Sequence, residues 1–324
     1  MVQYQISPNQ SFQIGYVGTF TRHLLVWSNA NNVSELLPPS ANPQLYVPYP
    51  DFARGFTYMT ANGNGYYHSL QATFERRFSQ GLNFLADYTW SKCRTDAEDP
   101  GTEDAEANQY RAAAIPGFGI QGDYGACNTD TRQIVHVGGS YQLPLGKGNK
   151  FASNPGRLAN GLLGGWSLNW ILTLQDGQPF TIYSDITTAA GVGADALLVP
   201  GQNPIGGLHN VNQWMNPAAF TNPPVATTVG QSDLAPLGGA PTQVFGPGTH
   251  RLDLSLFKQF QISETTHLEF RAEFFNLTNT PNFSMPVPYT SAVDFESPNF
   301  GQITMTRDAP NDPRQIQLAM KFYW

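Results

Sequence analysis

Charged residues are scarce in this chain of 324 residues. Asp, Glu, Lys and Arg together make up 13% of it, whereas soluble domains usually contain about 25%. Lys and Arg form no run or stripe and the net charge is −7, so we expect no nucleic-acid partner. Aromatic residues reach 13%, beside 31 Gly and 25 Pro. Low charge with many aromatic residues and turn formers predicts an all-β protein with long loops.

Long apolar runs and an export signal are also missing. The chain has no stretch of about 18 apolar residues, so the sequence predicts no transmembrane helix. The first residues after Met1 contain neither the basic n-region nor the apolar h-region of a signal peptide. If the protein is exported, we therefore expect its signal upstream and regard the sequence as a fragment.

Apolar and polar residues alternate with a period of two in many short segments. The clearest segment is the last, where apolar residues stand at every second position from Ile316 to Trp324. A β-strand puts such alternating residues on opposite faces, and helical spacing does not occur. Nine segments follow this pattern: 2–6, 11–20, 66–78, 82–91, 132–143, 166–175, 250–260, 266–278 and 316–324.

The connections between these segments alternate in length. Short turns occur at 7–9, 79–81 and 263–265, and one connection, 144–164, is intermediate. Long loops occupy about 21–64, 92–130, 178–249 and 279–313. Short periplasmic turns and long extracellular loops are typical of membrane barrels. The predicted fold is therefore an all-β, antiparallel transmembrane β-barrel segment, and composition alone leaves a secreted β-sandwich open.

Segment 300–307 alternates weakly, but we predict that it does not cross the membrane as a tenth strand. Segment 266–278 follows a short turn and should run outward, whereas the last segment should run inward to a periplasmic C-terminus. One additional crossing between them would break the up-and-down order.

The alternation also predicts which side chains face lipid. Trp170, Leu254, Phe270 and Leu318 are expected to point outward, and the residues beside them, Asn169, Asp253, Arg271 and Gln317, inward. The charged residues expected to line the lumen carry both signs: Glu75, Arg77, Asp87, Arg251, Asp253, Glu269, Arg271 and Glu273. We expect them to contact one another or a plug, with a substrate path as the alternative.

Aromatic residues concentrate near the expected strand ends. Membrane barrels carry aromatic girdles at both interfaces, whereas the alternative is the ordinary strand preference of aromatic residues. The residues concerned are Phe20, Tyr66, Tyr67, Trp90, Trp166, Phe260, Tyr323 and Trp324.

The sequence contains no recognisable catalytic or metal-binding motif. The six His residues form no HExxH pair, and no G-x-S-x-G elbow is present. We expect no enzyme, no cofactor and no bound metal. The stretch 191–196 resembles a dinucleotide-binding pattern but lacks a following helix, so we interpret it as loop. The acidic residues Asp96, Glu98, Asp99, Glu103, Asp104, Glu106 and Asp123 leave a Ca²⁺ site open, although a solvated surface loop is favoured.

The long loop 178–249 is the candidate binding region. It contains no Lys or Arg, and uncharged aromatic and amide side chains suit a neutral ligand such as a glycan. The alternative is that the loop packs against itself. The candidate residues are Phe180, Tyr183, Trp214, Asn216 and Phe220.

The two cysteines, Cys93 and Cys127, lie in the same predicted extracellular loop. Thiols outside the cytosol tend to oxidise, so we expect a disulfide between them.

Several phrases resemble the barrel of TonB-dependent outer-membrane receptors, most closely the Oar-like branch that carries a carboxypeptidase-regulatory-like domain. They are YHSLQATFERRFSQGLNFLADYTWSK (67–92), GGWSLNWILTLQDGQPFTI (164–182), WMNPAAF (214–220), HRLDLSLFKQF (250–260), LEFRAEFFNLTNTPNF (268–283) and DPRQIQLAMKFYW (312–324).

The resemblance implies a barrel of about 22 strands in the outer membrane of a Gram-negative bacterium, filled by a plug that would lie upstream of Met1 with the segment that contacts TonB. It also implies that the barrel-assembly machinery recognises the last strand through Ile316, Leu318, Met320, Phe322 and Trp324. The expected function is ligand uptake. An outer-membrane structural or adhesion protein and a soluble secreted β-domain that binds carbohydrate are the alternatives.

Overall fold

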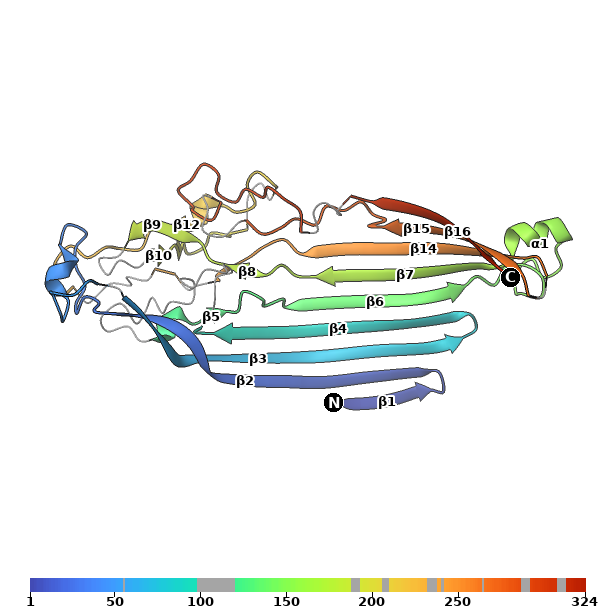
Figure 1. Ribbon diagram of the computed structural model, residues 1–324, viewed down its shortest axis with the longest axis horizontal. Helices are drawn as coiled ribbons and strands as arrows, with labels where there is room; N and C mark the ends of the chain where they lie inside the picture. Colours follow the sequence, from blue (N-terminus) through green and yellow to red (C-terminus); the bar gives the residue numbers. More distant parts are fainter. Residues whose placement is uncertain are drawn as a thin grey trace.

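The computed structural model of the chain is dominated by one long antiparallel β-sheet (Figure 1). It describes residues 1–54, 56–97, 120–187, 193–205, 210–231, 238–239, 242–263, 265–286, 292–307 and 313–324. The nine principal strands are β1 (Val2–Ser7), β2 (Gln10–Ala30), β3 (Phe56–Ser79), β4 (Leu82–Thr95), β6 (Gln133–Gln142), β7 (Trp166–Gln175), β14 (Thr249–Gln261), β15 (His267–Phe275) and β16 (Gln315–Tyr323).

Each principal strand pairs with the next one along the chain, from β1 at one edge to β16 at the other. The two-residue strand β5 (Gly125–Ala126) adds only to the end of β4. All nine predicted strands are therefore confirmed, and the bounds of β7 match the prediction. Within the described residues the sheet remains open, because β1 and β16 do not pair with each other.

The remaining elements are short. The two- to five-residue strands are β8 (Pro179–Phe180), β9 (Tyr183–Thr187), β10 (Gly193–Asp195), β11 (Leu197–Leu198), β12 (Phe220–Thr221) and β13 (Val244–Phe245). The helices are α1 (Arg157–Leu163) and the 3-10 turns η1 (Pro43–Tyr46), η3 (Ile120–Asp123) and η4 (Pro217–Ala219). In the part of the chain that the structure describes, no helix is both long and apolar enough to traverse a bilayer. No sequence pattern predicted α1.

Short turns and long connections lie at opposite ends of the sheet (Figure 1). The β3–β4 turn shows why the short ones are tight, because Ser79 pairs with Leu82 and only two residues lie between them. These two residues, Gln80 and Gly81, have φ angles of 54° and 81°. Two successive positive φ angles are those of a two-residue turn whose twist matches that of the flanking strands.

The strand register sorts side chains into an apolar and a polar face. On the apolar face, one row across five neighbouring strands consists of Phe74, Ala86, Val137, Leu172 and Leu252. The adjacent row on the polar face consists of Thr73, Asp87, His136, Thr173 and Arg251. Exceptions such as Ile171 and Phe257 are few. The predicted alternation therefore holds across the sheet and not only along single strands.

The apolar face carries large exposed side chains. Leu318 and Met320 of β16 are 65% and 66% exposed, and their cross-strand neighbours Ala272 and Phe270 are also apolar. A contiguous apolar surface of this extent needs an apolar environment. The residues predicted to face lipid, Trp170, Leu254, Phe270 and Leu318, all lie on this face.

The bounds of the first long loop differ from the prediction of 21–64. Strands β2 and β3 continue pairing as far as Ala30 and Phe56, so only residues 31–55 form the connection. The register shifts twice, between Arg22 and Leu24 and between Leu24 and Val26, and His23 has a positive φ of 58°. Each such bulge inserts a residue and reverses the alternation, and this conceals the strand from a period-two search.

Segment 300–307 does not form a strand of the main sheet, as predicted. Phe300 and Ile303 are buried at 3% and 7% exposure, and β15 pairs directly with β16. The segment contacts other loops through Ile303 N–H, which donates to the Val211 carbonyl at 2.8 Å.

The assignment of faces predicts different effects for two neighbouring substitutions on β16. Leu318→Arg should lower the free energy of unfolding in lipid by about 2–4 kcal/mol, because it puts a charge on the lipid-facing side. Gln317→Arg should have little effect, because Gln317 lies opposite Glu273 on the polar face. Urea unfolding of both variants in lipid vesicles measures the difference, and equal losses would refute the assignment.

Gly139 on β6 provides a second prediction. A Cβ there would lie 2.6 Å from Trp170 Cζ2 and 2.7 Å from the Asn83 carbonyl oxygen, whereas at Gly138 the nearest atom would be 3.8 Å away. Gly139→Ala should therefore cost about 1–3 kcal/mol through overpacking, and Gly138→Ala should change stability by less than about 0.5 kcal/mol. The same urea titration tests the pair, and a Gly139→Ala variant as stable as Gly138→Ala contradicts the packing.

Candidate functional site

The long connections fold together at one end of the sheet into a unit that we call the cap. It consists of the described parts of 179–187, 193–221, 242–246, 282–286 and 292–303. Figure 1 shows β9, β10 and β12 in this unit, beyond the ends of β6 and β7. The cap thus draws on two long loops, the one that follows β7 and the one that follows β15.

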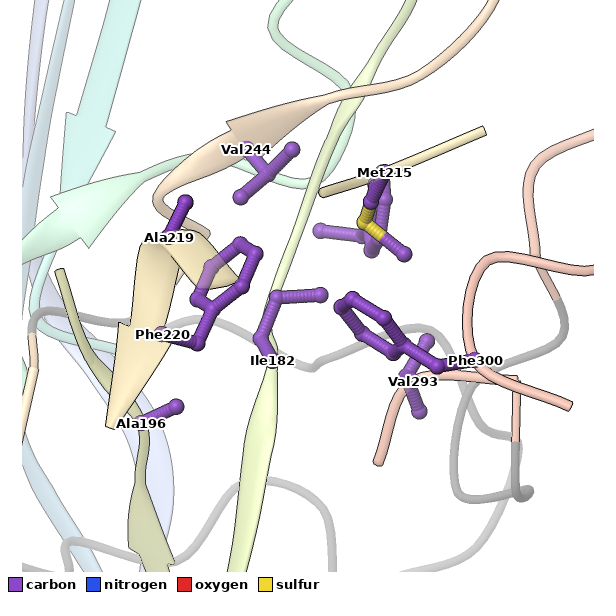
Figure 2. Packing of buried hydrophobic residues seen from close by; sticks show 9 residues of the cluster. Ile182, Ala196, Met215, Ala219, Phe220, Val244, Val293 and Phe300 are labelled. Carbon is purple, nitrogen blue, oxygen red and sulfur yellow. The ribbon is translucent and has the colours of Figure 1, made fainter. Parts of the chain in front are cut away.

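The cap has a hydrophobic core of its own, separate from the sheet. Figure 2 shows Ile182, Met215, Phe220 and Phe300 directed toward one another from different segments. Ile182 is fully buried, and Met215 is 1% exposed. The Phe220 ring packs edge-on against Phe300 with centroids 5.5 Å apart. Burying each large side chain contributes about 1.5–3 kcal/mol, so this core gives the loops a defined shape.

Backbone hydrogen bonds connect the two loops of the cap. Tyr183 N–H donates to the Val293 carbonyl at 3.0 Å, and Trp214 N–H donates to the Gly301 carbonyl at 2.9 Å. Buried backbone groups need such partners. The loop that follows β4 joins the same unit, because the Thr242 hydroxyl donates to the Ala126 carbonyl at 2.6 Å.

All five predicted binding residues lie in the cap, but they occupy different environments. Phe180 and Phe220 are each 5% exposed and belong to the core. Their rings therefore support the fold of the loop, which was the alternative for this region. Tyr183 and Trp214 are only partly buried and pack on the outside of the core. A ligand-contacting role for these two stays a prediction.

Asn216 has a structural role. It precedes η4, and its side-chain oxygen accepts the Ala218 N–H at 3.1 Å while Pro217 starts the turn. Asn before Pro is a known turn-forming pair, so the sequence offered a signal for this turn. By contrast, no pattern singled out Ile182, Met215 or Val293 as core residues of the cap.

A smaller core shapes the β2–β3 connection. Val33, Leu37 and Val47 are buried together, and the Asn31 amide donates to the carbonyl oxygens of Tyr49, Phe52 and Ala53. The Gly230 N–H donates to the Leu36 carbonyl at 2.7 Å. This bond joins the β2–β3 connection to the loop that follows β7.

The disulfide expected between Cys93 and Cys127 is present, with their Cα atoms 5.4 Å apart. It lies where β5 pairs with the end of β4. Beside it, Asp130 accepts the Cys93 N–H at 2.8 Å and is 2% exposed. Burial raises the pKa of the Asp130 carboxyl, and the Cys93 N–H and Arg132 oppose that rise.

Tyr124 stands three residues before Cys127, and its ring packs against Tyr66 of the apolar face with centroids 6.2 Å apart. Burial and a hydrogen bond with Tyr66 raise the pKa of Tyr124 to about 12. The Arg94 guanidinium stacks over its ring at 4.4 Å. The disulfide, the Asp130 carboxylate and this stacked pair together hold the end of β4 in place.

Ion pairs on the polar face form along single strands. Arg251 pairs with Asp253 at 3.0 Å, Arg271 with Glu269 at 2.5 Å, and Arg77 with Glu75 at 3.5 Å. Each pair joins residues two positions apart, which share a face of a strand. Six of the eight predicted lumen residues thus contact one another, which is one of the roles expected for them.

The described residues give no support to the Ca²⁺ site that the sequence left open or to the dinucleotide-binding pattern. Of the acidic residues considered for Ca²⁺, Asp96 and Asp123 are buried, and Glu98, Asp99, Glu103, Asp104 and Glu106 lie outside the described residues. The described ranges contain no group of three His, Cys, Asp or Glu side chains arranged to hold a metal ion. Gly193–Asp195 form strand β10 paired with β9, and not the start of a helix.

The disulfide yields a prediction. Cys93→Ser, Cys127→Ser and the double variant should each lower the free energy of unfolding by the same amount, up to about 3–4 kcal/mol in the loop-entropy model. Equal single and double losses are expected because either substitution alone removes the bond. Urea unfolding without reductant measures all three, and additive losses or free thiols in the wild-type protein would contradict the bond.

A family comparison agrees with this architecture. The family described as outer membrane beta barrel domain matches residues 1–317. The crystal structure of the outer membrane transporter YddB from Escherichia coli matches 99% of this chain at 9% sequence identity, with a TM-score of 0.38. The chain spans 30% of the length of that transporter. No curated protein sequence matches the chain.

Proposed function

The chain belongs to the outer membrane beta barrel domain family, and we propose that it forms part of the wall of a TonB-dependent receptor that binds a ligand outside and admits it past a plug. The family membership assigns it to the outer membrane. We propose that the apolar face meets lipid there and that the long-loop end faces outward, as in other membrane barrels. Energy coupling through TonB, the plug and the Oar-like assignment rest on the resemblance of the strand sequences.

The packed cap is the observation that carries the proposal. In a barrel with a purely structural role, each loop needs only to pair its own backbone polar groups. Here two long loops go further and share a hydrophobic core of nine residues. Ligand sites are usually pre-formed by rigid surroundings. A cap with a fixed shape at the outer end of the wall is suited to present the partly buried side chains of Tyr183 and Trp214 to a ligand.

The composition of the cap favours a neutral ligand. Its largest loop, 178–249, contains no Lys or Arg, so an anionic ligand would find no cationic partner there. Aromatic rings that bind through apolar contact and amides that form hydrogen bonds suit a neutral glycan. Trp214 is the residue expected to contribute most, because Trp is enriched among the residues that dominate binding energy.

The proposal also has to provide partners for the two open edges of the sheet, β1 and β16. In lipid every backbone polar group must be paired, so β1 and β16 each require a neighbouring strand. We propose that further strands of the receptor supply these partners and that the plug fills the space next to the polar face. The ion-paired polar face is suited to contact a hydrated plug.

Uptake by cells tests the function. Cells that produce the full-length protein, with and without a functional TonB system, are incubated with fluorescein-labelled neutral dextran oligosaccharides. We expect accumulation in the periplasm only when both the protein and TonB are present. Surface binding without uptake in either strain would instead favour the adhesion alternative, and a charged polygalacturonate probe bound more tightly than dextran would contradict the ligand class.

A matched pair of variants extends this test to the cap. Trp214→Ala should weaken binding by about 2 kcal/mol, roughly 30-fold, whereas Leu198→Ala, which truncates an exposed apolar residue of the cap, should not. Fluorescence anisotropy of the labelled oligosaccharide measures both affinities. Equal affinities of the two variants would remove Trp214 from the proposed site.

The last strand is proposed to act as the signal for the barrel-assembly machinery. Ile316, Leu318, Met320 and Phe322 alternate along β16 on the apolar face, and Trp324 follows the strand with its ring stacked on Phe322 at 6.1 Å. Trp324 is 90% exposed, so its ring is accessible to such a partner.

Deletion of residues 322–324 from the full-length protein should block its insertion into the outer membrane. The deletion removes the aromatic end and the pairing of β16 with Leu268 and His267. Heat-modifiable migration of the protein from outer-membrane fractions measures insertion. Normal levels of the folded form after the deletion would refute the signal, and the replacement Trp324→Phe, which keeps an aromatic end, serves as the control.

A further inference from the structure

The connection between β6 and β7 carries an unpartnered apolar helix at the short-turn end of the sheet. Helix α1 lies at the same end of the sheet as the C-terminus (Figure 1). Leu158 and Leu162 on this helix are 89% and 71% exposed, and Leu163 and Phe151 are 42% and 54% exposed. So many exposed large apolar side chains within 13 residues of sequence, 151–163, require an apolar partner.

The helix is amphipathic although it has only seven residues. At about 100° per residue, Leu158, Leu162, Ala159 and Leu163 fall within an arc of about 140°. Asn160 lies on the opposite side, and its side-chain oxygen accepts the Lys147 N–H at 2.7 Å. The polar side is therefore occupied by the connection itself, and the apolar side is left open.

Two side chains of the apolar face hold the C-terminal end of α1. The Trp166 indole N–H donates to the Leu162 carbonyl at 2.8 Å, and the Lys258 ammonium donates to the Gly164 carbonyl. Trp166 and Lys258 pair across β7 and β14 in the row that continues to Phe270 and Met320. The end of α1 is thus fixed against the apolar side of the wall, at the end of the sheet where the short turns lie.

The β6–β7 connection is also positively charged. Residues 144–165 contain Lys147, Lys150 and Arg157 and no acidic residue. The apolar face at this end adds Arg76, while Lys258 is 2% exposed and occupied by the Gly164 carbonyl. Within the described strands every charged side chain on that face is basic. An apolar helix side flanked by cations matches the boundary between lipid acyl chains and phosphate headgroups.

We propose that the β6–β7 connection is an interfacial anchor, in which α1 lays Leu158 and Leu162 into the periplasmic leaflet of the outer membrane while Lys147, Lys150 and Arg157 contact phospholipid phosphates. The anchor fixes the depth and the rotation of this part of the wall relative to the bilayer. It depends on the membrane location of the chain and is independent of TonB-dependent uptake.

Spin labelling of the full-length protein tests the anchor. Single variants Leu158→Cys, Leu162→Cys and Arg157→Cys are labelled without reductant, so that Cys93 and Cys127 stay bonded, and are reconstituted in vesicles of phosphatidylethanolamine and phosphatidylglycerol. Power saturation compares the accessibility of each label to oxygen, which partitions into lipid, and to a water-soluble nickel chelate. All three positions are exposed, so the variants are expected to fold, and heat-modifiable migration verifies this.

The anchor predicts a several-fold higher ratio of oxygen to nickel accessibility at positions 158 and 162 than at position 157. Nickel accessibility at 158 equal to that at 157 would overturn it, because the helix would then lie in water. Labels shielded from both reagents would also overturn it, since the helix would then be covered by protein. Dipolar broadening between labels would identify a second copy of the chain as that protein.

Discussion

The constraint on which the structure depends is that backbone polar groups in lipid must be paired within the protein. Antiparallel neighbours along the chain satisfy this with the shortest connections, and each strand from β1 to β16 therefore pairs with the next. Pairing in register also fixes the faces, because a slip of one residue would exchange every side chain between lipid and lumen. Rows such as Phe74, Ala86, Val137, Leu172 and Leu252 follow from that requirement.

Outside the membrane the chain buries its apolar side chains in a core, as a water-soluble domain does. The apolar side chains of the wall point away from the protein, whereas Ile182, Met215, Val244 and Phe300 point toward one another and exclude water. The two regions are joined where strands end, through the Cys93–Cys127 disulfide and the bond from Thr242 to Ala126. The cap can therefore differ widely in sequence while the wall keeps its alternation, because the two are stabilised by different environments.

This division explains how far the sequence predicts the structure. Period-two alternation locates all nine principal strands because each has one face in contact with lipid along the part that crosses the membrane. It fails beyond Arg22, where two bulges reverse the alternation, and β2 and β3 continue unseen. It also fails for α1, which is too short for a helical period and is flanked by Gly156 and Gly164.

The cap was the least predictable part, for a related physical reason. Its core gathers a few residues from each of several segments, such as Phe180, Phe220 and Val293, and no local period marks them. In the sequence alone, an aromatic loop residue that packs in a core cannot be distinguished from one that contacts a ligand. Phe180 and Trp214 could therefore be nominated together, and only their burial separates them.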